Sequence, residues 1–417
     1  MTLDTLTAPA ARSDGYRRGS AGYTRITLSL FAAGLATFVS MYSAQALLPA
    51  LSEDFRAGPA SAALAVSATT GVLALVIVPA SVLSERFGRT RVMVFSAAAS
   101  CAIGLLLPLS TSMGMLVAGR ALQGATLAGI PAVAMAYLAE EVYRGDLGAA
   151  MGRYVAGTTI GGLVGRLVPS AVLDVSDWRW AMVAASTLAL LFAVVMTRTM
   201  PPSQHFRPQA VRPRVVLANL ADHLRDPALR VLFGLGFILM GGFVSAYNFL
   251  GFRLVDAPFG LPDAVVGLVF LMYLAGTVTS SISGRVADRL GRRWVLLAAV
   301  VVTASGLLCT LSGRLPMVLA GMLLFTGGFF AAHSVASGWV GVLATAHRAE
   351  ASALYLFSYY LGSSVAGAGA GVAYAAGGWS GTVAYIGVLM IVGLVLALTM
   401  IRVGRLPVRP VGAPHPG

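Results

Sequence analysis

Twelve runs of about twenty mostly apolar residues follow one another along this chain, with short polar segments between them. A helix needs about 20 such residues to cross the hydrocarbon core of a bilayer, and its backbone hydrogen bonds must be satisfied within the helix. The sequence therefore predicts an all-α membrane protein with twelve transmembrane helices. The predicted helices begin near Ile26, Ala60, Val92, Met113, Leu147, Ala181, Leu229, Ala264, Val295, Pro316, Ser352 and Thr382.

The charge content agrees with a membrane location. Of the 417 residues, 57% are hydrophobic and only 11% are charged, whereas about 25% of the residues of a soluble domain are charged. All 29 positive charges are arginines, and most of them lie between the apolar runs. The formal charge of +13 therefore reflects membrane topology, and we expect no nucleic acid partner.

The arginines also predict an orientation. If the N-terminus is cytoplasmic, the segments on the outer side contain only Arg56, Arg179, Arg253 and Arg314, and most other arginines fall on the inner side. Cytoplasmic loops of membrane proteins carry an excess of basic residues. We therefore predict that both termini are cytoplasmic and that the arginine-rich face contacts anionic lipids of the inner leaflet.

The longest polar stretch, between the sixth and seventh predicted helices, divides the chain into halves. The predicted organisation is a cytoplasmic tail over 1–25, a six-helix bundle over 26–200, a cytoplasmic linker over 201–227, a second six-helix bundle over 228–403 and a cytoplasmic tail over 404–417.

A charged segment occurs once in each half. Residues 81–92 read SVLSERFGRTRV, and residues 283–294 read SGRVADRLGRRW. A second echo pairs YVAGTTIGG, which starts at Tyr154, with YYLGSSVAG, which starts at Tyr359. Two parallel repeats with a site between them are typical of transporters. The charged segments align as Ser81 with Gly284, Glu85 with Asp288, Arg86 with Arg289, Gly88 with Gly291 and Arg89 with Arg292.

These motifs resemble those of a known family. The pattern G-x-x-x-D-R-x-G-R-R over 284–293 is similar to the signature loop of the major facilitator superfamily. Residues 119–124, GRALQG, resemble the R-x-x-Q-G motif of its proton-coupled members, and residues 157–166 resemble its antiporter motif. With stretches such as AMAYLAEE and PPSQHFRP, the chain is most similar to the YnfM-like, acriflavine-sensitivity branch of bacterial drug and metabolite exporters.

The resemblance implies a multi-pass secondary active transporter of the bacterial inner membrane. It implies a monomer, without cofactor or metal, that exports a small organic solute (a drug-like amphiphile or a sugar-like metabolite) by alternating access and proton exchange. The alternative is an uncoupled or uptake carrier for a sugar or metabolite. A membrane sensor or enzyme on this scaffold is more remote. The sequence has no cluster of nucleophile and base and, lacking lysine, no P-loop, so no enzymatic activity is predicted.

The two charged segments are candidate gating loops. The resemblance implies that Glu85 faces the start of the eleventh helix near Arg348, and that Asp288 faces the start of the fifth near Arg144. A carboxylate at an exposed helix N-terminus stabilises the structure by about 0.3–1 kcal/mol. These contacts between an acid and a helix of the opposite half, called the latch below, are therefore weak enough to break in each transport cycle. The alternative is that these charges serve topology alone. The candidate gating residues are Glu85, Arg86, Gly88, Arg89, Gly284, Asp288, Arg289, Gly291 and Arg292.

Two arginines lie inside predicted helices. Arg120 has apolar neighbours, and Gln123 shares its helix face. An intramembrane charge costs several kcal/mol unless it faces water or a partner. We expect Arg120 to face the central cavity and to bind substrate or couple protons, the alternative being a structural anchor. Arg166 stands where the family has glycine, and both snorkelling and function are open for it. The helix-5 motif consists of Gly157, Gly161, Gly165 and Arg166.

His333 is the only histidine inside a predicted helix, and Phe325, Phe329 and Ser337 recur on its face at four-residue spacing. Because histidine titrates near neutral pH, His333 is a candidate proton carrier. Hydrogen-bonded packing is the alternative.

No Asp or Glu lies deep in any predicted helix. The first helix offers Tyr42 and Gln45 where many drug–proton exchangers have a carboxylate. Without an anionic site, neutral or anionic amphiphiles or polyols are better matched as substrates than strong cations. Further candidate cavity residues are Asn248, Tyr355 and Tyr359.

Overall fold

The structure is a computed structural model, and it describes residues 15–206 and 213–403. These residues are almost entirely helical and contain no β-strand, so the predicted all-α fold is confirmed. The predicted tails over 1–14 and 404–417, and residues 207–212 of the predicted linker, lie outside the described residues.

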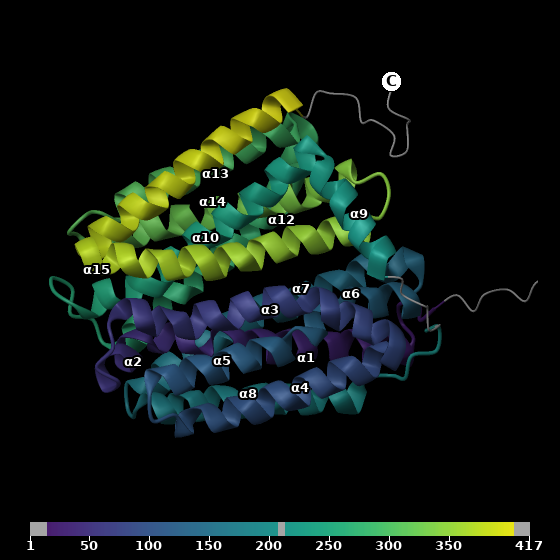
Figure 1. Cartoon of the computed structure of the whole chain (residues 1–417), viewed down its shortest axis with the longest axis horizontal. Helices are drawn as coiled ribbons and strands as arrows, with labels where there is room; N and C mark the ends of the chain where they lie inside the picture. The colour runs from purple at the N-terminus through teal and green to yellow at the C-terminus, as the bar shows by residue number, and fades with distance from the viewer. Residues whose placement is uncertain (1–14, 207–212, 404–417) are drawn as a thin grey trace, which may run out of the picture.

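The helices form two bundles, which lie one above the other in Figure 1. The lower bundle contains α1 (Ala21–Tyr42), η1 (Ser43–Leu47), α2 (Leu48–Asp54), α3 (Pro59–Phe87), α4 (Arg89–Leu106), η2 (Leu107–Leu109), α5 (Met113–Leu127), α6 (Gly129–Glu141), η3 (Arg144–Asp146), α7 (Leu147–Leu173) and α8 (Trp178–Thr199). The upper bundle contains α10 (Pro227–Val255), α11 (Asp263–Gly267), η4 (Leu268–Leu271), α12 (Met272–Leu290), α13 (Arg292–Cys309), α14 (Leu315–Leu343) and α15 (Arg348–Val403).

The twelve predicted spans are present, although two of them share one element. Among the described residues, 11 helices are long and apolar enough to cross a membrane. The 56-residue α15 holds both the eleventh and the twelfth predicted span. The two spans are separated within α15 by Gly377 and Gly378, where the backbone leaves helical geometry. Gly378 has φ 55°, which glycine adopts at little cost. The chain turns back there and crosses the bundle again (Figure 1).

The predicted linker contains a helix that the sequence interpretation did not include. This helix, α9 (Pro213–Arg225), lies at the same end of the molecule as the end of α15 (Figure 1). His223 of α9 bonds through Nε2 to the carbonyl oxygen of His347 at 3.1 Å, so α9 is attached to the upper bundle. We refer to this end as the terminal end and to the opposite one as the far end.

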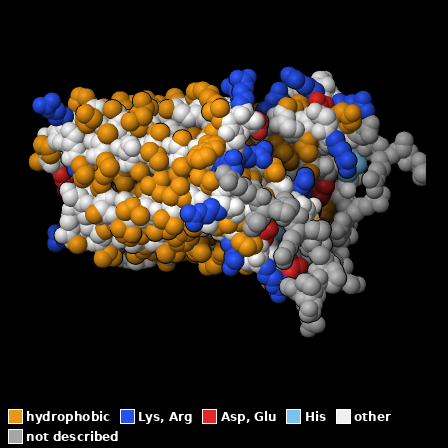
Figure 2. All heavy atoms as spheres, turned by 90° about the horizontal axis from the view of Figure 1, so that it is seen from above, with side chains coloured by type: hydrophobic (Ala, Val, Ile, Leu, Met, Phe, Trp, Pro, Cys, Tyr) orange, Lys and Arg blue, Asp and Glu red, His pale blue; other side chains and the backbone are white. Residues whose placement is uncertain are grey.

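The surface has the distribution that a bilayer requires. Figure 2 shows an apolar band around the middle, with arginines gathered toward the terminal end and fewer at the far end. In helices long enough to cross a membrane, large side chains such as Phe95 and Val372 are each 71% exposed. Apolar side chains facing outward at such exposure fit contact with lipid rather than water.

The second sequence echo corresponds to the same packing in both bundles. A Cβ atom on Gly157 of α7 would lie 2.3 Å from the carbonyl oxygen of Phe31 in α1. A Cβ atom on the aligned Gly362 of α15 would lie 2.1 Å from the carbonyl oxygen of Phe237 in α10. Small residues let membrane helices approach this closely. Each repeat therefore packs its fifth helix directly on its first.

Candidate functional site

The two charged loops have the same backbone. Gly88 (φ 96°, ψ 147°) ends α3 and precedes α4, and Gly291 (φ 88°, ψ 132°) ends α12 and precedes α13. This conformation is essentially restricted to glycine, which explains why the aligned residue is glycine in both halves.

The aligned acids also have aligned partners, since Glu85 pairs with Arg89 and Asp288 with Arg292. The first pair is tighter. Arg89 is 5% exposed and also bonds Glu140 of α6 at 2.8 Å. By contrast, the side chain of Asp288 is 71% exposed and 3.5 Å from Arg292.

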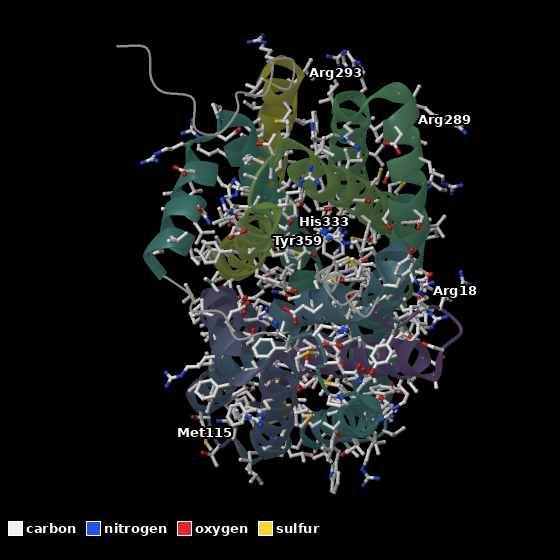
Figure 3. All side chains as sticks on the ribbon, turned by 90° about the vertical axis from the view of Figure 1, so that its right-hand side faces the viewer. Arg18, Met115, Arg289, Arg293, His333 and Tyr359 are labelled. Carbon is white, nitrogen blue, oxygen red and sulfur yellow. The ribbon has the colours of Figure 1, made fainter. Side chains whose placement is uncertain are left out.

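The predicted contacts of these acids with the opposite half are not formed in this structure. Glu85 and Asp288 bond arginines of their own loops, and Arg348 donates from Nε to the carbonyl oxygen of Ala344 in its own bundle. Both loops lie at the terminal end, whereas the hydrogen bonds between the bundles that the described residues form lie at mid-depth or toward the far end. Figure 3 shows Arg289, the second base of the upper loop, at the periphery of this end.

The expectation that Arg120 faces the central cavity is wrong for this structure. Arg120 is 0% exposed and lies inside the lower bundle. Its guanidinium donates to the carbonyl oxygens of Ser40 (2.8 Å), Met41 and Ala65 (3.0 Å), and to Oε1 of Gln123 (2.6 Å). The last carbonyl groups of a helix have no partner within it and carry partial negative charge. Arg120 therefore satisfies the end of α1, where the chain passes into η1.

Arg166 lies at the interface between the bundles. It is 2% exposed, donates from Nε to Oε1 of Gln45 at 2.7 Å, and donates from Nη1 to the carbonyl oxygen of Gly162. Its guanidinium carbon lies 4.1 Å from the ring centre of Tyr42, 4.7 Å from that of Tyr273 and 5.2 Å from that of Phe270. The last two rings belong to the upper bundle. Arg166 is thus an interface residue, and it does not snorkel to the surface.

Direct hydrogen bonds join the bundles at three places in the described structure, and all lie at mid-depth or toward the far end. They link Gln45 Nε2 to Asn248 Oδ1 (2.7 Å), Ser363 Oγ to Thr70 Oγ1 (3.3 Å) and Ala264 N to Asp174 Oδ1 (3.5 Å). The predicted cavity residues Gln45 and Asn248, which are 203 positions apart, are therefore direct partners.

His333 lies where the two bundles meet, as seen from the terminal end in Figure 3, with Tyr359 beside it. Its Nδ1 is 2.9 Å from the hydroxyl of Tyr355, and its ring centre is 4.6 Å from that of Tyr359. The predicted tyrosines of α15 therefore share one face, and that face contacts His333. Tyr355 is buried, whereas His333 and Tyr359 are partly exposed.

A continuous series of aromatic rings connects His333 with Arg166. His333 stacks on Phe329, Phe329 contacts Phe330, Phe330 contacts Tyr273, and Tyr273 lies against Arg166. Sequence reasoning did not single out Phe270 or Phe330 as site residues. They lie in uninterrupted apolar runs, where neither spacing nor composition separates a site residue from a packing residue.

Comparison with known proteins agrees with this architecture. The family model of the Major Facilitator Superfamily matches residues 30–261 and 254–416. The chain is 42% identical over 386 residues to the inner membrane transport protein YnfM of Escherichia coli (strain K12), covering 93% of each chain. It is 37% identical to the uncharacterised MFS-type transporter YybF of Bacillus subtilis (strain 168), covering 94% of this chain and 97% of that one. A solved bacterial homologue of the human lysosomal transporter Spinster, inward-facing and unoccupied, superposes with a TM-score of 0.77 at 15% identity, covering 92% of this chain and 98% of that one.

The chain belongs to the Major Facilitator Superfamily. It is a multi-pass membrane transporter and not an enzyme. The predicted location in the inner membrane is confirmed by the relationship to YnfM.

Proposed function

We propose that the protein exports a small organic solute in exchange for protons, and that His333 carries the proton. The observation on which the proposal rests is the His333–Tyr355 pair, 2.9 Å apart where the bundles meet, with the imidazole partly exposed. No carboxylate competes for this role in the described part of the chain, because its Asp and Glu residues lie at helix ends or in loops.

The arrangement of the bundles supports alternating access. The arginines predict that the terminal end is cytoplasmic. With that orientation, the hydrogen bonds toward the far end lie on the periplasmic side, which supports the proposal of a state that is closed on that side and opens toward the cytoplasm. Transporters with two repeats exchange such a state for its opposite by rocking one bundle against the other.

The chemistry of the pair suits a proton that is taken up and released in each cycle. A neutral imidazole has one donor and one acceptor nitrogen, and a tyrosine hydroxyl can either donate or accept. The pair therefore keeps its hydrogen bond when His333 is neutral and when it is protonated. In the inward-facing state the imidazole ring releases its proton to the cytoplasm, and solute from the cytoplasm then binds between the bundles. In the outward-facing state a periplasmic proton returns, and solute leaves.

Purified protein in proteoliposomes with an imposed pH gradient tests this proposal. Uptake of three solutes (an organic cation, an organic anion and a neutral sugar) is measured with and without the gradient. His333→Gln is expected to abolish gradient-driven accumulation and to keep downhill exchange of the same solute. His223→Gln, which changes a histidine of α9 instead, is the matched control and is expected to behave as wild type.

A second readout separates proton coupling from packing. Tyr355→Phe keeps the ring and removes the hydroxyl that bonds His333, so it is expected to shift the pH profile of transport and to preserve accumulation at the optimal pH. Gradient-driven accumulation in His333→Gln with an unchanged pH profile would show that another group carries the proton. Wild-type transport that does not respond to the gradient would favour an uncoupled carrier.

A further inference from the structure

We infer that the solute carries an anionic group on an aromatic or apolar body, and that Arg166 binds that group. The inference rests on the proposed transport function and adds the chemical class of the substrate. Arg120, inside the lower bundle, and Arg166, at its interface with the upper bundle, are both buried but have different surroundings.

The two guanidinium groups differ in how well they are satisfied. Arg120 donates four hydrogen bonds, three of them to backbone carbonyl groups. Arg166 donates two, to Gln45 and Gly162, and its Nη2 has no hydrogen-bond partner among the described residues. No ion pair is formed by Arg166 in the described structure, although it is 2% exposed. A buried charge without an opposite charge costs several kcal/mol, so the site is suited to an anion.

The side-chain amides of Gln45 and Asn248, next to Arg166, also lack a hydrogen-bond acceptor for one of their donors. An arginine only donates, so Gln45 must turn Oε1 toward Arg166 and Nε2 toward Asn248. Asn248 accepts with Oδ1 at 2.7 Å, which leaves its Nδ2 buried and without a partner. Arg166 thus sets the orientation of both amides. Among the described residues of this interface, Arg166 Nη2 and Asn248 Nδ2 are unpartnered donors on its two sides, and the hydroxyl of Ser67, which faces Gly367 of α15, has no partner either.

Packing of the repeat does not require an arginine at this position. At the offset that aligns Gly157 with Gly362, the counterpart of Arg166 in α15 is Gly371, which packs against Ala60 of α3. A Cβ atom on Gly371 would lie 2.6 Å from Cα of Ala60. The fold therefore accepts a residue without a side chain at the equivalent place, and the charge of Arg166 is a feature of the lower bundle alone.

The rings around Arg166 indicate the body of the solute. Tyr42, Phe270 and Tyr273 present aromatic surfaces within 4.1–5.2 Å of the guanidinium carbon. From Tyr273 the aromatic series continues through Phe330, which is partly exposed, toward His333. A planar apolar body contacts such surfaces favourably, while its carboxylate accepts charge-assisted hydrogen bonds from the guanidinium. A strongly cationic solute would be repelled by Arg166.

Equilibrium binding of three matched probes tests this inference. Naphthoate, naphthamide and naphthylmethylammonium share one ring system and carry a negative, a neutral and a positive group. Binding to the purified full-length protein is measured by competition with labelled naphthoate, without a pH gradient. We expect naphthoate to bind most tightly and the ammonium probe most weakly. Arg166→Gln is expected to weaken naphthoate binding by about 10- to 100-fold, the range for a charge-assisted hydrogen bond, and to leave naphthamide unchanged.

Further variants exclude a purely structural role. Arg166→Lys keeps the charge without the planar fork and is expected to retain part of the preference for naphthoate. Arg153→Gln, an exposed arginine of α7 that bonds Thr27, is the matched control and is expected to bind as wild type. If Arg166 only clamps the bundles, Arg166→Gln changes the binding of all three probes by the same factor, and the inference is wrong.

Failure to bind naphthoate more tightly than naphthamide also overturns the inference. Because no gradient is applied, the order of probe affinities does not depend on proton coupling. His333→Gln is expected to keep that order, so a failure of the proposed proton exchange leaves this result intact. Conversely, a gradient-driven carrier that prefers the ammonium probe would retain the proposed exchange and refute the assignment of Arg166.

Discussion

At the scale of single residues, two buried arginines of the lower bundle, Arg120 and Arg166, have different contacts. Arg120 donates two hydrogen bonds to carbonyl groups at the end of α1, one to the carbonyl group of Ala65 in α3 and one to Gln123 of its own helix. Arg166 lies against rings of the opposite bundle. Both positions carry an intramembrane charge, and the difference lies in the acceptors that surround each guanidinium.

Arg120 is therefore expected to matter first for stability. Arg120→Ala removes a donor from the carbonyl groups of Ser40, Met41 and Ala65 and from Oε1 of Gln123. The carbonyl oxygens of Ser40 and Ala65 keep the hydroxyl donors of Ser43 and Thr69, whereas a buried acceptor that is left unsatisfied costs about 1–3 kcal/mol. We expect a large drop in the thermal unfolding temperature of the purified protein, with a smaller drop for Arg120→Lys. Arg153→Ala, at an exposed position of α7, serves as control. An alanine variant that unfolds like wild type but no longer transports would instead support the cavity role expected from the sequence.

At the scale of elements, glycines set the distance between the first and fifth helices of each repeat. In α7, Gly157, Gly161 and Gly165 follow one face, and the Cβ atoms they lack would lie 2.3–2.8 Å from backbone atoms of α1. The three glycines of the helix-5 motif thus form a packing surface against α1, and Arg166 is the one residue of the motif with a charged side chain.

The packing surface can be tested with glycines of one helix. Gly157→Ala places a methyl group 2.3 Å from the carbonyl oxygen of Phe31, and overpacking of this kind costs about 1–3 kcal/mol. Gly152 of the same helix has no atom within 4 Å of the added Cβ atom, and alanine there should stabilise the helix by about 0.5–1 kcal/mol. Thermal unfolding should therefore move in opposite directions for the two variants. Equal shifts would show that α7 does not depend on close approach to α1.

At the scale of the whole molecule, the described hydrogen bonds between the bundles lie at mid-depth or toward the far end, and the acids of the two candidate gating loops at the terminal end pair with arginines of their own loops. Alternating access requires the far-end bonds to break once per cycle. Under the proposed alternating access, we expect the predicted contacts between the loops and the opposite bundle to form in the other state, in which the terminal end is closed.

Cross-linking can hold one state. In a background without Cys101 and Cys309, Thr70→Cys with Ser363→Cys replaces two hydroxyl oxygens that are 3.3 Å apart, and oxidation should join the bundles and stop transport until a reductant is added.

Arg144→Cys with Asp288→Cys tests the predicted latch in the same assay. This pair should cross-link only when the terminal end closes, so locking the first pair should abolish its reaction. Full transport by the oxidised Thr70→Cys and Ser363→Cys protein would contradict rocking about this interface.

The sequence by itself determined the all-α membrane fold, the number of crossings and the repeat, because these follow from local properties. Span length is set by bilayer thickness, and the glycines of both loops follow from a backbone conformation that other residues avoid. The tyrosines of α15 shared a face because helical spacing puts them there.

Only the tertiary structure decided what Arg120 and Arg166 contact. Both are arginines in apolar runs, and helical periodicity specifies a face without specifying what packs against it. The acceptors around Arg120 come from α1 and α3, and the rings around Arg166 come from segments more than a hundred positions away. A buried charge is tolerated or functional according to those distant neighbours, and their positions depend on how the two bundles pack.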